Sequence, residues 1–277
     1  DWSSDVCSSD LNEIAYNSVA VNLVSTGDYN TLISNTVAGS MYSIGDRNTL
    51  GYNKVGENIV SIGDYNTVAS NTVAGSVYSS GDRNILEYNQ VGGNIVSSGD
   101  YNTVAFNTVA GSVYSEGLRN TIEYNQVGGD IYSIGSYNVI EHNIVGGGIV
   151  SSGDYNTINY NQVGGSVYSA GDYNTLTNNL IAGDLVSYGD YNLIGANQVG
   201  GSLFSAGDNN SVISNIVTGD INVGGNNNYV NGNIAGGVIS VNGGNNIFGM
   251  NVQLSELAGY ITTQGNILFE GVNDGFI

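Results

Sequence analysis

A repeat of 18 residues runs through the chain and constrains its fold more than any other feature. Glycine recurs at every eighteenth residue from Gly27 to Gly243, thirteen times without a slip, and we number this glycine position 1 of the repeat. Positions 4 and 9 are asparagine in all fourteen repeats that contain them, and position 6 is always apolar. One such short unit cannot bury a core by itself, so successive units must stack on one another.

Alternation within the repeat predicts strands. Positions 9, 11, 13, 15 and 17 are mostly small or apolar, which is the period of two that a strand with one buried face shows. Glycine, asparagine, threonine and valine are weak helix formers. We therefore expect an all-β fold, a single-stranded parallel β-solenoid (β-helix) with 18 residues per coil, about 13–14 coils and two or three short faces. The pattern leaves the handedness of the coil open.

The two asparagine columns fall on inward positions and predict hydrogen-bonded ladders. A buried amide without a partner costs about 1–3 kcal/mol. Identical side chains stacked at the strand spacing of about 4.8 Å can each donate to one neighbour and accept from the other. The ladder residues that we single out are Asn30, Asn48, Asn66, Asn84, Asn102 and Asn120 at position 4, and Asn35, Asn53, Asn71, Asn89, Asn107 and Asn125 at position 9.

The tyrosines mark the outer surface. All 20 fall on positions that we expect to face outward. One interpretation is aromatic pairing between neighbouring coils, which stabilises a sheet. The other is that exposed, rigid rings form a binding surface for glycans or other filaments. The candidate binding residues, all at position 16, are Tyr42, Tyr78, Tyr114 and Tyr168.

Aspartate at position 2 forms a column of like charges, which repel by roughly 1 kcal/mol per neighbour even in water. Arg47, Arg83 and Arg119 at position 3 offer one relief. Bound Ca²⁺, which prefers carboxylate and carbonyl oxygens, is another, and the alternative is that aspartate serves as a plain turn former. Apart from possible calcium, we expect no cofactor. The candidate calcium ligands are Asp28, Asp46, Asp64, Asp82 and Asp100.

Composition excludes several classes of function. With 24 acidic against 4 basic residues and a net charge of −20, the chain lacks the basic footprint of a nucleic-acid-binding protein. No apolar run has the length of a membrane span. A single histidine, His142, allows neither a Ser-His-Asp triad nor a multi-histidine metal site, and we expect no enzyme.

Three segments differ in pattern. Residues 1–11, which read DWSSDVCSSDL, resemble the conceptual translation of a short-read sequencing adapter. We expect them to be an artefact without ordered structure, joined to a truncated bacterial protein. Residues 12–250 are the expected solenoid, and residues 251–277 are a degenerate last coil or C-terminal cap. In that last segment Asn266, Ile267 and Leu268 recover the motif two residues late.

The segment S-x-G-D-[YR]-N-T-[VLI]-x-x-N, as in Ser61 to Asn71, resembles the curlin repeat. Both have a Gly-x-x-Asn corner with an apolar residue two positions later. In this chain Ser replaces the first glutamine of that family, Asn replaces the second, and the coil is shorter. The resemblance implies an extracellular, self-stacking β-solenoid and a possible fibre subunit.

These features together predict a non-enzymatic extracellular or cell-surface protein, a stalk, adhesin or matrix fibre. Its expected partners are further copies stacked end to end, or surface glycans. Two alternatives stay open. The first is an ice-binding protein, because the outward threonine column at position 5, which includes Thr31, Thr49 and Thr67, resembles the threonine arrays of that class. The second is a calcium-stabilised secreted repeat protein.

Overall fold

The computed structural model describes residues 5–254, 262–263 and 267–268. Its described secondary structure consists of 44 strands, and every described pairing between them is parallel. This confirms the expected parallel β-solenoid, with 13 turns of about 18 residues. The chain divides into two compact units, which we describe separately. The first contains the described residues up to Val139 and Asn143–Gly146, and the second contains Ile140–His142 and the described residues from Gly147 onward.

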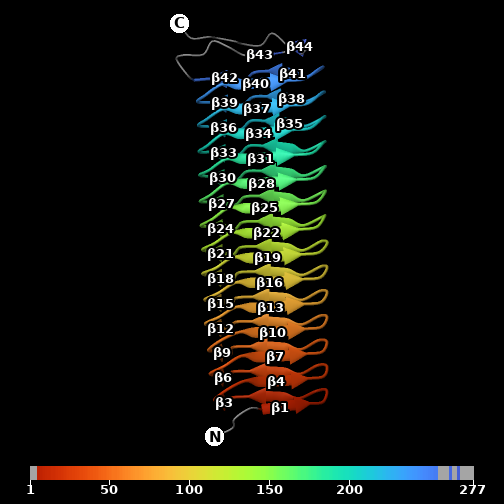
Figure 1. Cartoon of the computed structure of the whole chain (residues 1–277), viewed down its shortest axis with the longest axis vertical. Coiled ribbons are helices and arrows are strands. Elements are labelled where there is room, and N and C mark those ends of the chain that lie inside the picture. Colours follow the sequence, from red (N-terminus) through yellow and green to blue (C-terminus); the bar gives the residue numbers. More distant parts are fainter. Residues whose placement is uncertain (1–4, 255–261, 264–266, 269–277) are drawn as a thin grey trace. The chain divides into compact units, whose positions relative to one another are not determined.

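Each coil of the first unit contributes one strand to each of three parallel sheets, which we name A, B and C (Figure 1). Sheet A contains β1 (Asp5–Ser8), β4 (Leu23–Thr26), β7 (Met41–Ile44), β10 (Ile59–Ile62), β13 (Val77–Ser80), β16 (Ile95–Ser98), β19 (Val113–Glu116) and β22 (Ile131–Ile134). Sheet B contains β2 (Glu13–Ala15), β5 (Thr31–Ile33), β8 (Thr49–Gly51), β11 (Thr67–Ala69), β14 (Ile85–Glu87), β17 (Thr103–Ala105) and β20 (Thr121–Glu123). Sheet C contains β3 (Ser18–Val19), β6 (Thr36–Val37), β9 (Lys54–Val55), β12 (Thr72–Val73), β15 (Gln90–Val91), β18 (Thr108–Val109), β21 (Gln126–Val127) and β24 (Ile144–Val145).

The second unit repeats the arrangement. Sheet A contains β25 (Ile149–Ser152), β28 (Val167–Ala170), β31 (Leu185–Tyr188), β34 (Leu203–Ala206), β37 (Ile221–Gly224), β40 (Ile239–Asn242) and β43 (Thr262–Thr263). Sheet B contains β26 (Thr157–Asn159), β29 (Thr175–Thr177), β32 (Leu193–Gly195), β35 (Ser211–Ile213), β38 (Tyr229–Asn231), β41 (Ile247–Gly249) and β44 (Ile267–Leu268). The residues of β23 (Val139–Glu141) are divided between the two units. Sheet C contains β27 (Gln162–Val163), β30 (Leu180–Ile181), β33 (Gln198–Val199), β36 (Ile216–Val217), β39 (Ile234–Ala235) and β42 (Val252–Gln253).

Corners separate the strands at fixed positions of the repeat. Strands occupy positions 15–18, 5–7 and 10–11, and neighbouring strands pair 18 residues apart, as Val77 pairs with Ile95. The glycine at position 1 has a positive φ, 128° at Gly63. Positions 3 and 8 also take the left-handed conformation, with φ of 59° at Tyr65 and 54° at Tyr88. These left-handed residues turn the chain between sheets and switch which residues face inward.

The core of each coil combines three apolar columns with three polar ones. Positions 6, 11 and 15 supply aliphatic side chains, and Val68, Val73 and Val77 are at most 2% exposed. Asparagine at positions 4 and 9 and serine at position 17 are buried beside them. Stacking therefore buries apolar and polar columns together, and the polar ones need partners inside the stack.

The structure corrects one expectation about the N-terminal segment. Asp5–Ser8 forms β1, which pairs with β4, although we expected residues 1–11 to lack ordered structure. The reason lies in the register. Asp5–Ser8 falls on positions 15–18, and the Leu11 amide at the next corner donates to the Asp28 carbonyl at 3.0 Å. The edge of β4 offers backbone groups that any extended segment can satisfy.

At the other end of the sequence, β44 pairs with β41 so that Ile267 faces Ile247, a spacing of 20 residues in place of 18. This pairing agrees with the two-residue delay of the motif in the sequence. The remaining residues of the expected cap, 255–261, 264–266 and 269–277, lie outside the described residues.

Two glycine substitutions in the first unit test the corner geometry. A Cβ at Gly63 would lie 2.2 Å from the Gly45 carbonyl oxygen, and the φ of 128° is unfavourable for alanine. At Gly51 a Cβ would meet nothing closer than 3.8 Å. We expect Gly63→Ala to lower the free energy of unfolding by about 2 kcal/mol or more and Gly51→Ala to leave it nearly unchanged. Urea denaturation measures both, and equal effects would contradict the corner geometry.

Candidate functional site: polar ladders and outward columns

The asparagine column at position 9 forms a complete side-chain ladder. In the first unit, Asn53 Nδ2 donates to Asn71 Oδ1 at 3.0 Å and to the Leu32 carbonyl at 2.8 Å. The backbone amide of Asn53 donates to the same Asn71 Oδ1 at 2.9 Å. Each side-chain oxygen thus accepts two bonds from the preceding coil, and each side-chain nitrogen makes two. This confirms the predicted ladder at position 9.

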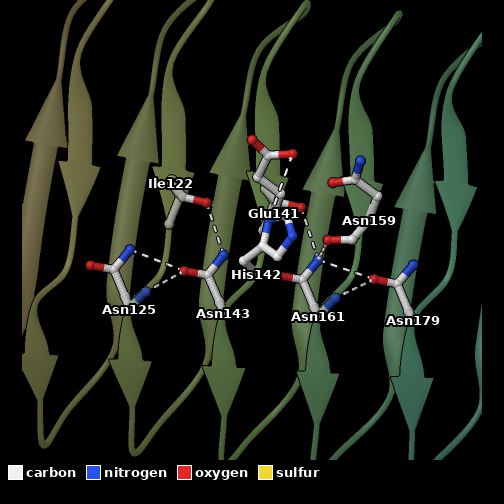
Figure 2. A network of polar contacts seen from close by, with 9 residues as sticks. Ile122, Asn125, Glu141, His142, Asn143, Asn159, Asn161 and Asn179 are labelled. Atoms are coloured by element: carbon white, nitrogen blue, oxygen red, sulfur yellow. Dashed lines mark hydrogen bonds and ion pairs between the residues drawn. The ribbon is translucent and has the colours of Figure 1, made fainter.

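Figure 2 shows this ladder in a short stretch of each unit. In the first unit, Asn125 Nδ2 donates to Asn143 Oδ1 at 3.0 Å, and Asn143 Nδ2 donates to the Ile122 carbonyl at 2.8 Å. In the second unit, Asn161 Nδ2 donates to Asn179 Oδ1 at 3.1 Å. The bonding pattern is the same in both units.

The column at position 4 differs from the prediction. The Asn48 backbone amide donates to Asn66 Oδ1 at 2.7 Å, but no side-chain-to-side-chain bond joins these residues. Several members turn Nδ2 to a nearby backbone carbonyl, as Asn120 does to Gly99. Buried Nδ2 groups without a hydrogen bond among the described residues are those of Asn48, Asn66, Asn84, Asn102 and Asn174. The column is buried and links successive coils as predicted, but the donor at this corner is the backbone amide of the preceding coil, not the side chain of the preceding asparagine.

The aspartate column at position 2 has a bonding role of its own. Asp64 Oδ1 accepts the backbone amide of Asp82 at 2.7 Å, and Asp46 Oδ1 accepts that of Asp64 at 2.8 Å. Asn226 occupies the same position and its Oδ1 accepts the Gly244 amide at 2.8 Å. Neutral and charged side chains at position 2 therefore have the same role: each accepts a hydrogen bond from a backbone amide of the following coil.

A fourth column, at position 14, was missed by the sequence analysis. From Asn22 to Ser112 asparagine and serine alternate there, and each accepts the backbone amide of the next coil. Asn58 Oδ1 accepts from Ser76 at 2.8 Å, and Ser76 Oγ accepts from Asn94 at 2.9 Å. The signal was present in the sequence as short polar residues 18 apart, but the two residue types alternate over 36 residues and hide the column.

Serine at position 17 is buried, but its hydroxyl does not accept a backbone amide of a neighbouring coil. The hydroxyls of eleven such residues, among them Ser61, Ser79 and Ser97, have no hydrogen bond among the described residues. The side-chain bonds described here that join coils therefore come from positions 2, 4, 9 and 14, beside the backbone bonds of the three sheets.

The arginines lie between tyrosines and do not pair with the aspartates. The guanidinium carbon of Arg47 lies 5.4 Å from the centre of the Tyr29 ring and 5.0 Å from that of Tyr65. Arg83 and Arg119 are held in the same way. Within the described residues, no carboxylate lies within ion-pair distance of these guanidinium groups. The arginines therefore form an alternating cation–π column at position 3, and they lie beside the aspartate column without a direct ion pair to it.

Other tyrosines stack directly on their neighbours. In the second unit the rings of Tyr155, Tyr173 and Tyr191 are 4.8 and 4.9 Å apart with interplanar angles of 3°. Burial of Tyr173 between the other two rings raises the pKa of its phenol. In the first unit Tyr88, Phe106 and Tyr124 stack at 5.0 Å. The prediction of aromatic pairing is confirmed, and in these columns the ring faces are covered while the edges meet solvent.

The candidate binding tyrosines lie on the outer face of sheet A. Tyr42 and Tyr78 alternate with valines in the register of the sheet, and Tyr78 is 43% exposed. Tyr114 stacks on Tyr132 at 4.8 Å. A hydrogen bond from the Tyr132 hydroxyl to Asp130, together with the charge of that carboxylate, raises the pKa of Tyr132. In the second unit Tyr168 contacts Tyr188 with tilted rings. These side chains give sheet A an aromatic and aliphatic face.

The titratable residues do not gather into a centre. Among the described residues, no group of three or more His, Cys, Asp or Glu side chains is placed to hold a metal ion. In the second unit His142 stacks on Tyr160 at 5.1 Å, and its Nδ1 lies 4.0 Å from Glu141 Oε2 (Figure 2). In the described part of the chain, no helix is long and apolar enough to cross a membrane.

The three sheets and their polar columns define the chain as a parallel β-solenoid repeat protein. Comparison with protein-family models, with curated proteins and with solved structures finds no match in any of the three. The resemblance to the curlin repeat therefore finds no support there and stays a prediction.

Two asparagines of one coil test the different ladders. Asn71 at position 9 makes four side-chain hydrogen bonds, whereas Asn66 at position 4 makes one, and both are at most 1% exposed. We expect Asn71→Ala to cost about 3 kcal/mol and Asn66→Ala about 1 kcal/mol, because the first leaves more buried groups unpaired. Urea denaturation and amide hydrogen exchange at Asn53 measure the difference. A larger loss from Asn66→Ala would contradict the assignment.

Position 2 offers a test that separates hydrogen bonding from calcium binding. We expect Asp64→Ala to destabilise the protein by about 1 kcal/mol, since the Asp82 amide loses its acceptor, and Asp64→Asn to retain stability. The chelator EDTA should leave the thermal midpoint unchanged. Circular dichroism follows each case. If EDTA and Asp64→Asn both destabilise the fold, calcium and not the amide bond explains the column.

Proposed function

We propose that this chain is a non-enzymatic structural repeat protein of the cell surface or extracellular matrix, acting as a stalk, adhesin or matrix fibre. The observation that carries the proposal is that the four polar columns join one coil to the next. At positions 2, 4, 9 and 14 a side chain of one coil accepts a backbone amide of its neighbour. The repeating polar residues are thus engaged in holding a stack together.

The bonds between coils also support self-assembly. Because each coil presents nearly the same donors and acceptors, a coil of a second copy offers the groups that a neighbouring coil offers within the chain. End-to-end stacking would extend the sheets by the pairing that already joins β10 to β13. This is the basis for proposing that further copies of the chain are partners.

The outer face of sheet A supports the adhesive part of the proposal. Tyr78 and Tyr114 lie there with Ile44 and Ile62, each of them 39% exposed or more. Flat aromatic and aliphatic surfaces of this kind are typical of binding faces. Surface glycans or a neighbouring filament are the proposed ligands. A net charge of −20 and the scarcity of lysine are compatible with an extracellular product.

Ice binding is retained as a second candidate on one observation. Thr31, Thr49 and Thr67 lie in direct register on sheet B. The array is interrupted by Ile85 in the next coil, and Glu87 lies on the same strand. These interruptions make the structural function the better supported of the two.

Assembly of the full chain tests the proposed function. We expect the purified protein, incubated at increasing concentration, to form filaments that bind thioflavin T and are visible by electron microscopy. The same samples are examined for thermal hysteresis and shaping of ice crystals. Folded protein that stays monomeric at high concentration would remove the fibre hypothesis, and thermal hysteresis without filaments would favour ice binding.

A further inference from the structure

The outer face of sheet C in the first unit differs from the rest of this acidic surface. Positions 10 and 12 supply its outward side chains, and from β6 to β21 these residues are all exposed. None of them is acidic, and Lys54 is the one charged residue among them. Glu57 directly follows Gly56 of this face in the sequence, and its Oε2 accepts a hydrogen bond from Ser40 Oγ at 3.0 Å. A protein with 24 acidic residues thus keeps one of its three sheets free of them.

On the same face, the length of the outward side chains alternates from coil to coil. Position 10 carries a long side chain in β9, β15 and β21 and threonine in β6, β12 and β18. We call the first set the long rows and the second set the short rows. Position 12 is glycine in the long rows and alanine in the short rows. A Cβ at Gly92 would lie 2.3 Å from the Ala74 carbonyl oxygen, so the backbone explains the glycines, but it does not explain the alternation at position 10.

Between two long rows lies a shallow groove of about 280 Å³. Gln90 and Gln126 flank it, and Thr108 and Ala110 form its floor. The side-chain amides of the two glutamines make no hydrogen bond within the described residues. The groove is therefore bordered by the free amide donors and acceptors of the two glutamines. Its floor presents the hydroxyl of Thr108 and the methyl group of Ala110. Figure 1 shows β12, β15, β18 and β21, which build this region, following one another along the first unit.

We propose that this face, from β6 to β21, is a lateral docking surface for a second copy of the chain. The partner is inferred from charge. Two molecules with a net charge of −20 repel each other, and most pairs of facing surfaces would bring carboxylates together. Cores of protein interfaces are depleted in charged residues, and sheet C is the face that meets this condition.

The alternating long and short rows also favour a second copy of the chain as the partner, because the long rows of one copy can fit into the short rows of another. Long and short rows alternate with a period of two coils, about 9.6 Å at the usual strand spacing. A two-fold axis that lies in the interface plane, parallel to the strands of sheet C, and passes between neighbouring coils therefore brings each long row of one copy over a short row of the other. Gln90 of one copy then enters a groove like the one above Thr108, where its amide meets a hydroxyl. Such an isologous contact closes a pair.

The inference is independent of the proposed stalk, adhesin or fibre function. End-to-end stacking uses the backbone edges of coils, whereas lateral docking uses outward side chains of sheet C. Either contact can form without the other.

Sedimentation of the full chain at increasing concentration tests the proposal. We expect wild-type protein to shift from the 28.8 kDa monomer toward twice that mass. Thr108→Glu places an unpaired carboxylate in the groove and should weaken this association about a hundredfold or more. Thr103→Glu, the same substitution on the outer face of sheet B, is the matched control and should leave it within about threefold. Circular dichroism checks that both variants are folded.

Three outcomes would overturn the proposal. The first is a wild-type chain that is folded and monomeric at every concentration. The second is an equal effect of Thr108→Glu and Thr103→Glu. The third is monomeric protein that sediments with insoluble cellulose, used as a neutral glucan probe, and loses this binding in Thr108→Glu, which would make a polysaccharide the occupant. Filaments that persist in Thr108→Glu while lateral pairs disappear would support the lateral surface and leave the end-to-end stacking intact.

Discussion

Every backbone amide at a corner must find an acceptor, and this requirement determines which side chains the repeat carries. Along the strands, amides bond to carbonyls of the neighbouring coil. At positions 2, 4, 9 and 14 the chain turns, and the acceptor is a side-chain oxygen 18 residues away, as Asn71 Oδ1 is for Asn53. A buried amide without a partner costs about 1–3 kcal/mol. The polar columns are thus the part of the structure on which stacking of the apolar columns depends.

The corners impose a second cost, which the outer columns offset. Positions 3 and 8 are left-handed throughout, and a non-glycine residue in this conformation costs about 1 kcal/mol or more. Both asparagine columns follow directly after these residues. Tyrosine or arginine is frequent at position 3, and the rings and guanidinium groups of successive coils stack, as Tyr155 does on Tyr173. Aromatic pairs contribute about 0.5–1.5 kcal/mol beyond their buried area. Stacking across coils therefore compensates strain within each coil.

The 18-residue period was sufficient to predict the fold class, the inward columns and the outward tyrosines, because a strict repeat fixes the register of every coil. The bonding at position 4 could not be predicted. Sequence shows that Asn66 is buried, but only the corner geometry shows that its oxygen serves the Asn48 backbone. Position 14 was hidden because Asn58 and Ser76 differ in type while sharing one role. The order of Asp5–Ser8 was missed because the resemblance of residues 1–11 to a translated adapter carries no information about their register with β4.

The distribution of charge links the architecture to function. Aspartates concentrate at position 2, at a corner, where Asp46 and Asp64 each accept an amide of the next coil. A corner exposes carboxylates to water, which screens their mutual repulsion. The flat outer faces carry fewer acids, namely Glu116 on sheet A and Glu13, Glu87, Glu123 and Glu141 on sheet B. Sheet A is thereby largely aromatic and aliphatic, and the outer face of sheet C from β6 to β21 is free of acids, with Lys54 as its one charged residue. The hydrogen-bonding needs of the backbone place the charges at corners, and the faces that result are the ones able to contact another molecule.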